Sequence, residues 1–510
     1  MNKILKTEAT LLGLVLGFGI YLGPALGCAH TQIKNSRKIS FMVTRSFENK
    51  EKRFEEYEKR ISLEPNVGKS ASSLAVGVNQ YKLAVSTSKT FQKMVGFGAA
   101  LTEASVINIL KLPVPQQEEL LMTLFDTKKG GGLNVIRVPM GSSDLADGSK
   151  GEYTYDDTPN GVEDPELKYF SMARDLKTLK LLNRILSINP SVKIMINPWS
   201  GPAWMKDNHS LYRGHFESKN NVAFANYFIR TIEEYHKHGI EVHYVGIQNE
   251  PGISIEYPSM LMSDEQQAEF IQILGARLEQ KSFAARIIAN DDNYIAISRV
   301  KKLLGYPTVA KQIGVVGFHC WSNDPEKALE VPPNIVMFET ECGGNINSQD
   351  YGYDFYWWLN KRVIDGSNFG LSAVITWNMV SDENAGPHGA GPDGCTTCRG
   401  LVTINPIDKN AEKNKISSEY EIEINSEFRA LMHASRFVKR GAQRISSILT
   451  FEGNDSKVIK HTAFKNPDGS VVLIIGNSGE ESFPLKLVLD NQPLLEQKIN
   501  AKESMTLVIH

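Results

Sequence analysis

Apolar residues in this chain follow two alternating patterns. Eight short stretches are apolar without a period and are bounded by glycine, proline or polar residues, which is typical of strands buried on both faces. They are residues 93–100, 132–140, 193–199, 243–250, 285–292, 314–321, 334–341 and 372–379. Segments with the apolar period of a helix lie between them. One of these helices is expected to begin at Ser263, because a serine followed three residues later by glutamine, Gln266, is a capping-box signature. The alternation predicts a (β/α)8 TIM barrel over residues 81–430.

From Arg444 onward the pattern changes to short strands without helices. Residues 461–465 and 471–475 flank an Asn-Pro-Asp-Gly sequence, which predicts a hairpin, and residues 483–489 and 505–509 add further strands. Because such strands bury their apolar side only by pairing, we expect a β-sandwich domain over residues 431–510. Residues 81–90 are a candidate further strand of it.

The first 28 residues predict an export signal, because Lys3 and Lys6 precede an apolar stretch at 11–26 that is broken by glycines. The sequence Ala-Leu-Gly-Cys28 is similar to a bacterial lipobox, although alanine replaces the usual leucine. A lipidated cysteine, ordinary cleavage and an uncleaved anchor remain alternatives. We therefore expect a periplasmic, surface-anchored or secreted protein, associated with a membrane surface if the N-terminus is anchored. Residues 29–80, with a run of mixed charges, predict a solvated tether or a surface helix.

Charge and cysteine content exclude some classes. The 56 basic and 58 acidic residues are interspersed and give a net charge of −2, so no nucleic-acid partner is expected. Cys395-x-x-Cys398 has the spacing of half a zinc site, but no second pair completes four ligands. A local disulfide or two free thiols is the better interpretation, and no metal is expected.

Glutamates end two of the predicted strands, Glu250 the fourth and Glu341 the seventh. The carboxyl ends of barrel strands converge on one face, so these two side chains are expected to face each other. Two carboxylates about 5 to 5.5 Å apart are enough to hydrolyse a glycosidic bond with retention, one as acid and one as nucleophile. Asn249 supplies an amide that can bond the sugar 2-hydroxyl.

Tryptophans end three other predicted strands: Trp199 the third, Trp321 the sixth and Trp377 the eighth. Sugars stack their apolar C–H faces on such rings. A single tryptophan at this place is more often part of the core. Three on one barrel predict sugar contacts, with Trp199 and Trp377 as walls of a subsite.

Several sequence words resemble glycoside hydrolase family 30. They are GFGAALTEA at 96–104, IRVPM at 136–140 with Ser143-Asp144, QNEP at 248–251, GCTTCRGLVT at 394–403 and HASRF at 433–437. The resemblance runs from about residue 80 to the C-terminus. Five ordered motifs over that length are a specific signal.

The resemblance implies that Glu250, in Asn-Glu-Pro, is the acid/base and that Glu341 is the nucleophile. Arg137 matches an arginine near the nucleophile, whose charge would favour the ionised form of Glu341. His319 matches a histidine at the end of the sixth strand. The positions that match glucose contacts of the family are Asp144, Trp199, Asn249 and Trp377. The family pattern has Trp-Tyr where this chain has Cys320-Trp321, so a tyrosine hydroxyl that could bond the nucleophile is missing.

Three functions follow from these motifs. The first is a retaining β-glucosidase that splits glucosylceramide into glucose and ceramide. The second is a β-1,6-glucanase with the same machinery, because residues 257–262 and 382–388 look closer to bacterial members of the family and to its β-1,6-glucanases. The third is a carbohydrate-binding protein without turnover, against which the intact Glu250, Glu341 and Asn249 argue. The expected partner is a glycolipid or a β-glucan, and carboxylate chemistry requires no cofactor.

Overall fold

The computed structural model describes residues 37–46, 54–63, 80–322, 325–348, 350–407, 420–452 and 458–510. The predicted export signal, residues 1–28, lies outside these ranges. None of the described helices is long and apolar enough to span a bilayer.

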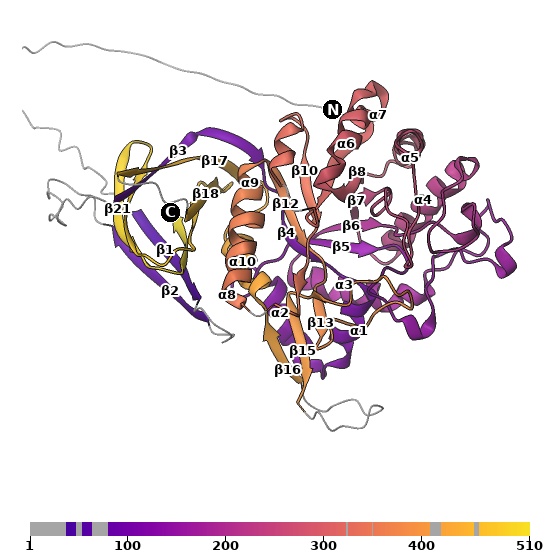
Figure 1. Ribbon diagram of the computed structural model, residues 1–510, viewed down its shortest axis with the longest axis horizontal. Helices are drawn as coiled ribbons and strands as arrows, with labels where there is room; N and C mark the ends of the chain where they lie inside the picture. Colours follow the sequence, from indigo (N-terminus) through magenta and orange to yellow (C-terminus); the bar gives the residue numbers. More distant parts are fainter. Residues whose placement is uncertain are drawn as a thin grey trace, which may run out of the picture.

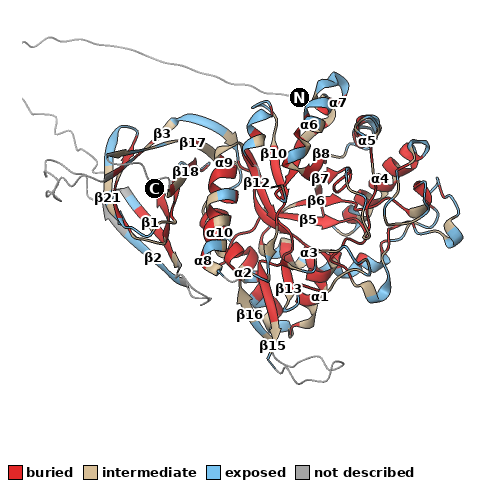
Figure 2. Cartoon of the chain, viewed as in Figure 1, coloured by how far each residue is buried: buried red, intermediate tan, exposed pale blue. Residues whose placement is uncertain are grey.

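Eight parallel strands close into a barrel, in the order β10-β12-β4-β5-β6-β7-β8-β9 (Figure 1). They are β4 (Gly96–Ala100), β5 (Val135–Pro139), β6 (Lys193–Asn197), β7 (Val242–Gly246), β8 (Arg286–Asn293), β9 (Ile313–His319), β10 (Met337–Glu341) and β12 (Leu371–Thr376). Each overlaps one predicted apolar stretch, so the predicted TIM barrel is confirmed. Buried residues run along nearly the whole of these strands, as Figure 2 shows, which explains why the stretches have no polar face.

The inside of the barrel is filled by side chains from seven of its strands. They are Val135, Met195, Tyr244, Ile288, Val315, Phe338, Ala373 and Ile375, and all of them are buried. The barrel is therefore packed in its middle, and space for a ligand can lie only at its ends.

Helices surround the barrel (Figure 1). They are α1 (Glu103–Lys111), α2 (Val114–Phe125), α3 (Leu176–Ile188), α4 (Asn221–Lys237), α5 (Asp264–Gln280), α6 (Ile297–Gly305), α7 (Pro307–Gln312), α8 (Tyr351–Trp357), α9 (Gly366–Asn368) and α10 (Ser426–Ser435). Ser263 and Gln266 form the predicted capping box at the start of α5. A π-helical turn, Trp358–Asp365, continues α8. In Figure 1, α8 and α10 lie between the barrel and the second domain.

The second domain is a β-sandwich built from a nine-stranded sheet in the order β2-β1-β22-β19-β18-β17-β3-β20-β21. Its strands are β1 (Arg37–Ser46), β2 (Phe54–Leu63), β3 (Gln80–Lys93), β17 (Gln443–Glu452), β18 (Ile459–Lys465), β19 (Val471–Asn477), β20 (Phe483–Leu489), β21 (Gln492–Ile499) and β22 (Glu503–Ile509). β18 and β19 pair from Lys465 and Val471 outward, as the predicted hairpin requires. The candidate strand at 81–90 lies within β3, which pairs with β17 and β20.

The tether predicted for residues 29–80 is wrong where the structure describes it, because β1 and β2 lie there. Ile39, Phe41 and Val43 alternate along β1 and are buried in the sandwich core, and β1 pairs with β22. The charges that suggested a solvated segment lie largely on β2, where Glu56 pairs with Arg429 of α10 at 2.6 Å. A period of two over five residues is a weak signal inside a charged region.

Two small sheets extend from the barrel. β11 (Gly344–Asn345) pairs with β14 (Cys398–Arg399). β13 (Val380–Asp382), β15 (Val402–Pro406) and β16 (Tyr420–Ile424) form the other. They bring the loop between β13 and β14 back to the carboxyl ends of the barrel strands.

Candidate active site

Two buried glutamates meet at the carboxyl ends of the barrel strands. Glu250 lies four residues beyond β7, and Glu341 is the last residue of β10. One carboxylate oxygen of each residue lies within 4.8 Å of the other. The pair that the sequence places 91 positions apart is therefore brought together, as expected from the strand ends.

Local backbone irregularities aim these groups into the site. Glu250 has a left-handed φ of 44°, and its N–H donates to the carbonyl of Asp291 at 3.0 Å. The pairing of β10 with β9 skips Thr340, and the pairing of β8 with β9 skips Asp291. Each bulge breaks the alternation of side chains along its strand. Asp291, itself at φ 44°, consequently points into the same site.

Glu341 is held by one donor on each oxygen. Arg137, from β5, forms an ion pair with Oε2, and the indole Nε1 of Trp321 donates to Oε1 at 2.9 Å. Arg137 is fully buried and also donates to Asp291 at 2.9 Å and to Asn249 Oδ1 at 2.7 Å. The bond to Asn249 occupies the amide oxygen, so its NH2 group is the end that can donate to a ligand.

Glu250 is surrounded by polar neighbours of a different kind. Its Oε1 lies 3.0 Å from His319 Nδ1 and accepts from Asn293 at 3.3 Å, and its Oε2 accepts from the Tyr257 hydroxyl at 3.4 Å. Burial raises the pKa of Glu250 above its usual range, and the charge of Glu341 adds to this, although the hydrogen bond with His319 opposes it. A raised pKa is what a proton donor at neutral pH needs.

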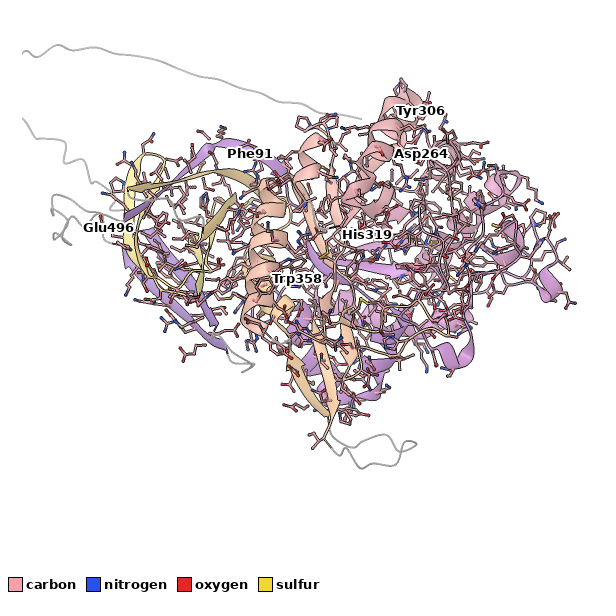
Figure 3. The ribbon with its side chains drawn as sticks, viewed as in Figure 1. Phe91, Asp264, Tyr306, His319, Trp358 and Glu496 are labelled. Carbon is pink, nitrogen blue, oxygen red and sulfur yellow. A yellow bond between two sulfur atoms is a disulfide. The ribbon has the colours of Figure 1, made fainter. Side chains whose placement is uncertain are left out.

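His319, the last residue of β9 and labelled in Figure 3, lies between the two carboxylates. Its Nδ1 lies 3.0 Å from Glu250 and 3.6 Å from Glu341, and its Nε2 lies 3.3 Å from Asp291. Burial alone would lower its pKa, but the charge of Glu341 and the hydrogen bonds to Asp291 and Glu250 raise it to about 10. The imidazole is thus cationic at neutral pH.

Asp144 belongs to the same group, and a second loop holds it there. The backbone N–H of Cys395 donates to Asp144 Oδ2 at 3.1 Å. Burial and the charge of Glu341 raise the pKa of Asp144 to about 7, against the effect of that bond. A disulfide joins Cys395 to Cys398, which decides between the two states that the sequence left open.

A second disulfide, between Cys320 and Cys342, was not predicted. Cys320 follows the last residue of β9, and Cys342 follows the last residue of β10. These strands are neighbours in the barrel, so the positions of the two cysteines at adjacent strand ends were a usable signal.

The three predicted aromatic residues differ in exposure. Trp199 and Trp377 stack on each other with ring centroids 5.0 Å apart, and the guanidinium of Arg137 lies 4.6 Å from the Trp199 ring. Both are 2% exposed, so little of either ring is open to a ligand, whereas Trp321 is 44% exposed. Their contacts with a sugar stay predictions.

Within the described ranges, one group of side chains has the spacing of metal ligands: Glu250, His319 and Glu341. These three side chains contact one another and two further partners: His319 lies 3.0 Å from Glu250 and 3.6 Å from Glu341, Arg137 forms an ion pair with Glu341, and the Trp321 indole donates to Glu341 at 2.9 Å.

Three residues of the site were missed from the sequence. They are Asp291, Asn293 and Tyr257. Asp291 and Asn293 lie at the end of the predicted fifth strand, where position alone was a signal, but the bulge that aims Asp291 inward is not visible in the pattern. Tyr257 lies in a loop, and its approach to Glu250 follows from tertiary folding alone.

Two glutamates that meet at the strand ends of a TIM barrel are an arrangement that glycoside hydrolases use. Residues 94–391 match the glycosyl hydrolase family 30 TIM-barrel domain, and residues 441–506 match the β-sandwich domain of the same family. The chain belongs to glycosyl hydrolase family 30.

Relatives of two kinds are similar to this chain. It is 29% identical over 436 residues to lysosomal acid glucosylceramidase of Mus musculus, with 79% of each chain covered. It is also 29% identical over 412 residues to endo-1,6-β-D-glucanase neg1 of Aspergillus fumigatus, with 76% of this chain and 79% of the relative covered. The solved structure of an endo-β1,6-glucanase superposes with a TM-score of 0.75 at 25% identity, covering 92% of this chain and 99% of the other.

Proposed function

We propose that this protein hydrolyses β-glucosidic bonds with retention of configuration, through a covalent glucosyl-enzyme. The observation that carries the proposal is the approach of Glu250 and Glu341 to within 4.8 Å between carboxylate oxygens. Retaining enzymes place the two carboxyl groups about 5 to 5.5 Å apart, whereas inverting enzymes leave about 6.5 to 9.5 Å for a water molecule.

The roles of the two glutamates follow from their surroundings. Glu341, with a cation and an N–H on its oxygens, is the nucleophile that attacks the anomeric carbon. Glu250, whose pKa is raised, protonates the leaving oxygen and then takes a proton from the water that releases glucose. The NH2 group of Asn249, oriented by Arg137, donates to the sugar 2-hydroxyl.

The mechanism is tested by product stereochemistry and by two isosteric variants. NMR of the first product is expected to show the β-anomer, and Glu341→Gln is expected to abolish turnover. Glu330→Gln, an exposed glutamate paired with Lys301, is the matched control and should keep wild-type rates. An α-anomer as first product, or full activity in Glu341→Gln, would rule out double displacement. Sugar binding by the wild type without any hydrolysis of an aryl β-glucoside would favour the binding-protein alternative.

For the substrate we propose glucosylceramide, supported by the similarity to the mouse glucosylceramidase. A β-1,6-glucan is the second candidate, supported by the fungal glucanases at similar identity and by the endo-β1,6-glucanase structure. Purified enzyme should be assayed on glucosylceramide in detergent micelles and on linear β-1,6-glucan in parallel. A higher kcat/KM on the glycolipid supports the first candidate, and release of oligosaccharides from the glucan supports the second.

We also propose that the protein is exported. The support is the sequence of residues 1–28, with Lys3 and Lys6 before an apolar stretch. Intact-mass measurement of the protein purified from its host separates the alternatives. The mass of a chain that begins at a diacylated Cys28 indicates a lipoprotein. The mass of an unmodified shorter chain indicates ordinary cleavage, and the mass of the full-length chain indicates an anchor or no processing.

A further inference from the structure

The loops that follow β9 and β10 form one connected unit beside Glu341. We propose that Trp321 is a positioning residue for Glu341 and that the Cys320–Cys342 disulfide holds its indole N–H on the carboxylate. The inference rests on the proposed role of Glu341 as the nucleophile. It adds a donor that the motifs of the sequence did not predict, at the position where the family pattern has tyrosine.

The hydrogen-bond geometry supports a specific role for the indole. Nε1 of Trp321 lies 2.9 Å from Oε1 of Glu341, and Arg137 occupies Oε2. Each oxygen thus has its own donor, which fixes the plane of the carboxylate. An indole N–H donates and never accepts, so Oε1 of Glu341 is the acceptor of this bond.

The disulfide joins the two backbone segments that carry this hydrogen bond. Cys320 directly precedes Trp321, Cys342 directly follows Glu341, and their Cα atoms are 5.1 Å apart. The N–H of Cys320 also donates to the carbonyl of Glu341 at 3.1 Å. Two covalently joined segments therefore carry the donor and the acceptor, which limits how far the half-exposed indole can move away.

Two further contacts hold the tryptophan in place. A Cβ built on Gly343 would lie 2.6 Å from Cη2 of Trp321, so the ring packs against a backbone position that has room only for glycine. The N–H of Ser322 donates to Asn293 at 2.9 Å, and Asn293 donates to Glu250 at 3.3 Å. The loop after β9 is thus tied to both glutamates.

The decisive variant is Trp321→Phe, which keeps an aromatic ring and removes the donor. We expect kcat/KM to fall about 10- to 100-fold, mainly through kcat, the range for losing a hydrogen bond to a charged group. KM should change little, because the lost donor acts on the carboxylate of Glu341. Trp357→Phe, a substitution at a tryptophan of α8, is the matched control and should leave kcat and KM unchanged.

Covalent labelling separates this inference from the proposed function. An activated 2-deoxy-2-fluoro-β-glucoside should add one glycosyl mass to the wild type at Glu341, more slowly to Trp321→Phe, and none to Glu341→Gln. A wild type that is not labelled at Glu341 would contradict the proposed function. Labelling of Glu341 at equal rates in the wild type and in Trp321→Phe, with identical kcat, would overturn the inference alone.

Two variants test the unit without touching the donor. Gly343→Ala should displace the indole and reduce the labelling rate as Trp321→Phe does, with no further loss when the two are combined. The double variant Cys320→Ala/Cys342→Ala should show a smaller loss of the same kind. If the cysteine variant is labelled at the wild-type rate, the disulfide has no part in holding the indole. If the losses for Gly343→Ala and Trp321→Phe are additive, the two substitutions do not act through the same hydrogen bond.

Discussion

Replacing Asp291 with asparagine removes one negative charge from the centre of the site at nearly constant side-chain size. Asp291 is fully buried, and its oxygens lie 2.9 Å from Arg137, 3.0 Å from Asn197 and 3.3 Å from His319. Burial alone would raise its pKa, but Arg137 and His319 lower it well below the usual range of aspartate. Two buried cations therefore share this carboxylate.

The size of the effect follows from that sharing. Removing one partner of a buried ion pair costs about 3 to 5 kcal/mol, because the other charge stays buried without compensation. In Asp291→Asn, Arg137 keeps Glu341 and His319 keeps the two glutamates, so we expect a cost near the lower end of that range. The pKa of His319 should fall from about 10, since one of the groups that raise it is gone.

Thermal unfolding and pH-dependent activity on an aryl β-glucoside measure both consequences. The variant should unfold at a lower temperature and lose activity on the alkaline side at lower pH than the wild type. Asp365→Asn is the matched control: Asp365 is buried, pairs with Lys460 at 3.0 Å and lies outside the site. It should lower stability without changing the pH profile. A wild-type unfolding temperature and pH profile in Asp291→Asn would refute the view that this carboxylate holds both cations.

Three other predictions concern the titrating groups of the site. Glu250→Gln should reduce kcat/KM about 10²- to 10⁴-fold on alkyl glucosides and far less on dinitrophenyl glucoside, whose leaving group needs no protonation; equal losses of kcat/KM on both would contradict its role as the acid. The pKa of His319 is raised from 6.5 to about 10, so its ion pairs stabilise the fold fully below about pH 6.5 and are lost as pH rises through about 10. The unfolding temperature of His319→Gln should therefore vary less between these two pH values than that of the wild type. With a pKa of about 7, Asp144 ionises near neutrality, and Asp144→Asn should remove an inflection near pH 7 from the kcat/KM profile; an unchanged inflection would assign it to another group.

The barrel was predictable because each strand is buried on both faces. Eight apolar stretches separated by helical periods have few alternatives to a closed parallel sheet, and the two glutamates follow from their places at strand ends. The hairpin of the sandwich was predictable for a similar reason, since its turn residues fix the register locally. Such features depend on neighbouring residues along the chain.

Long-range contacts decided the rest. Asp291 faces the site because a bulge in β8 breaks the alternation, and no local pattern records that bulge. The strand β1 joins the sandwich sheet through β22, more than 450 residues later in the chain. Which groups hold a proton is likewise a tertiary property: the sequence supplies Glu250, His319 and Asp144 with their ordinary pKa values, and only their burial beside Glu341 and one another moves those values.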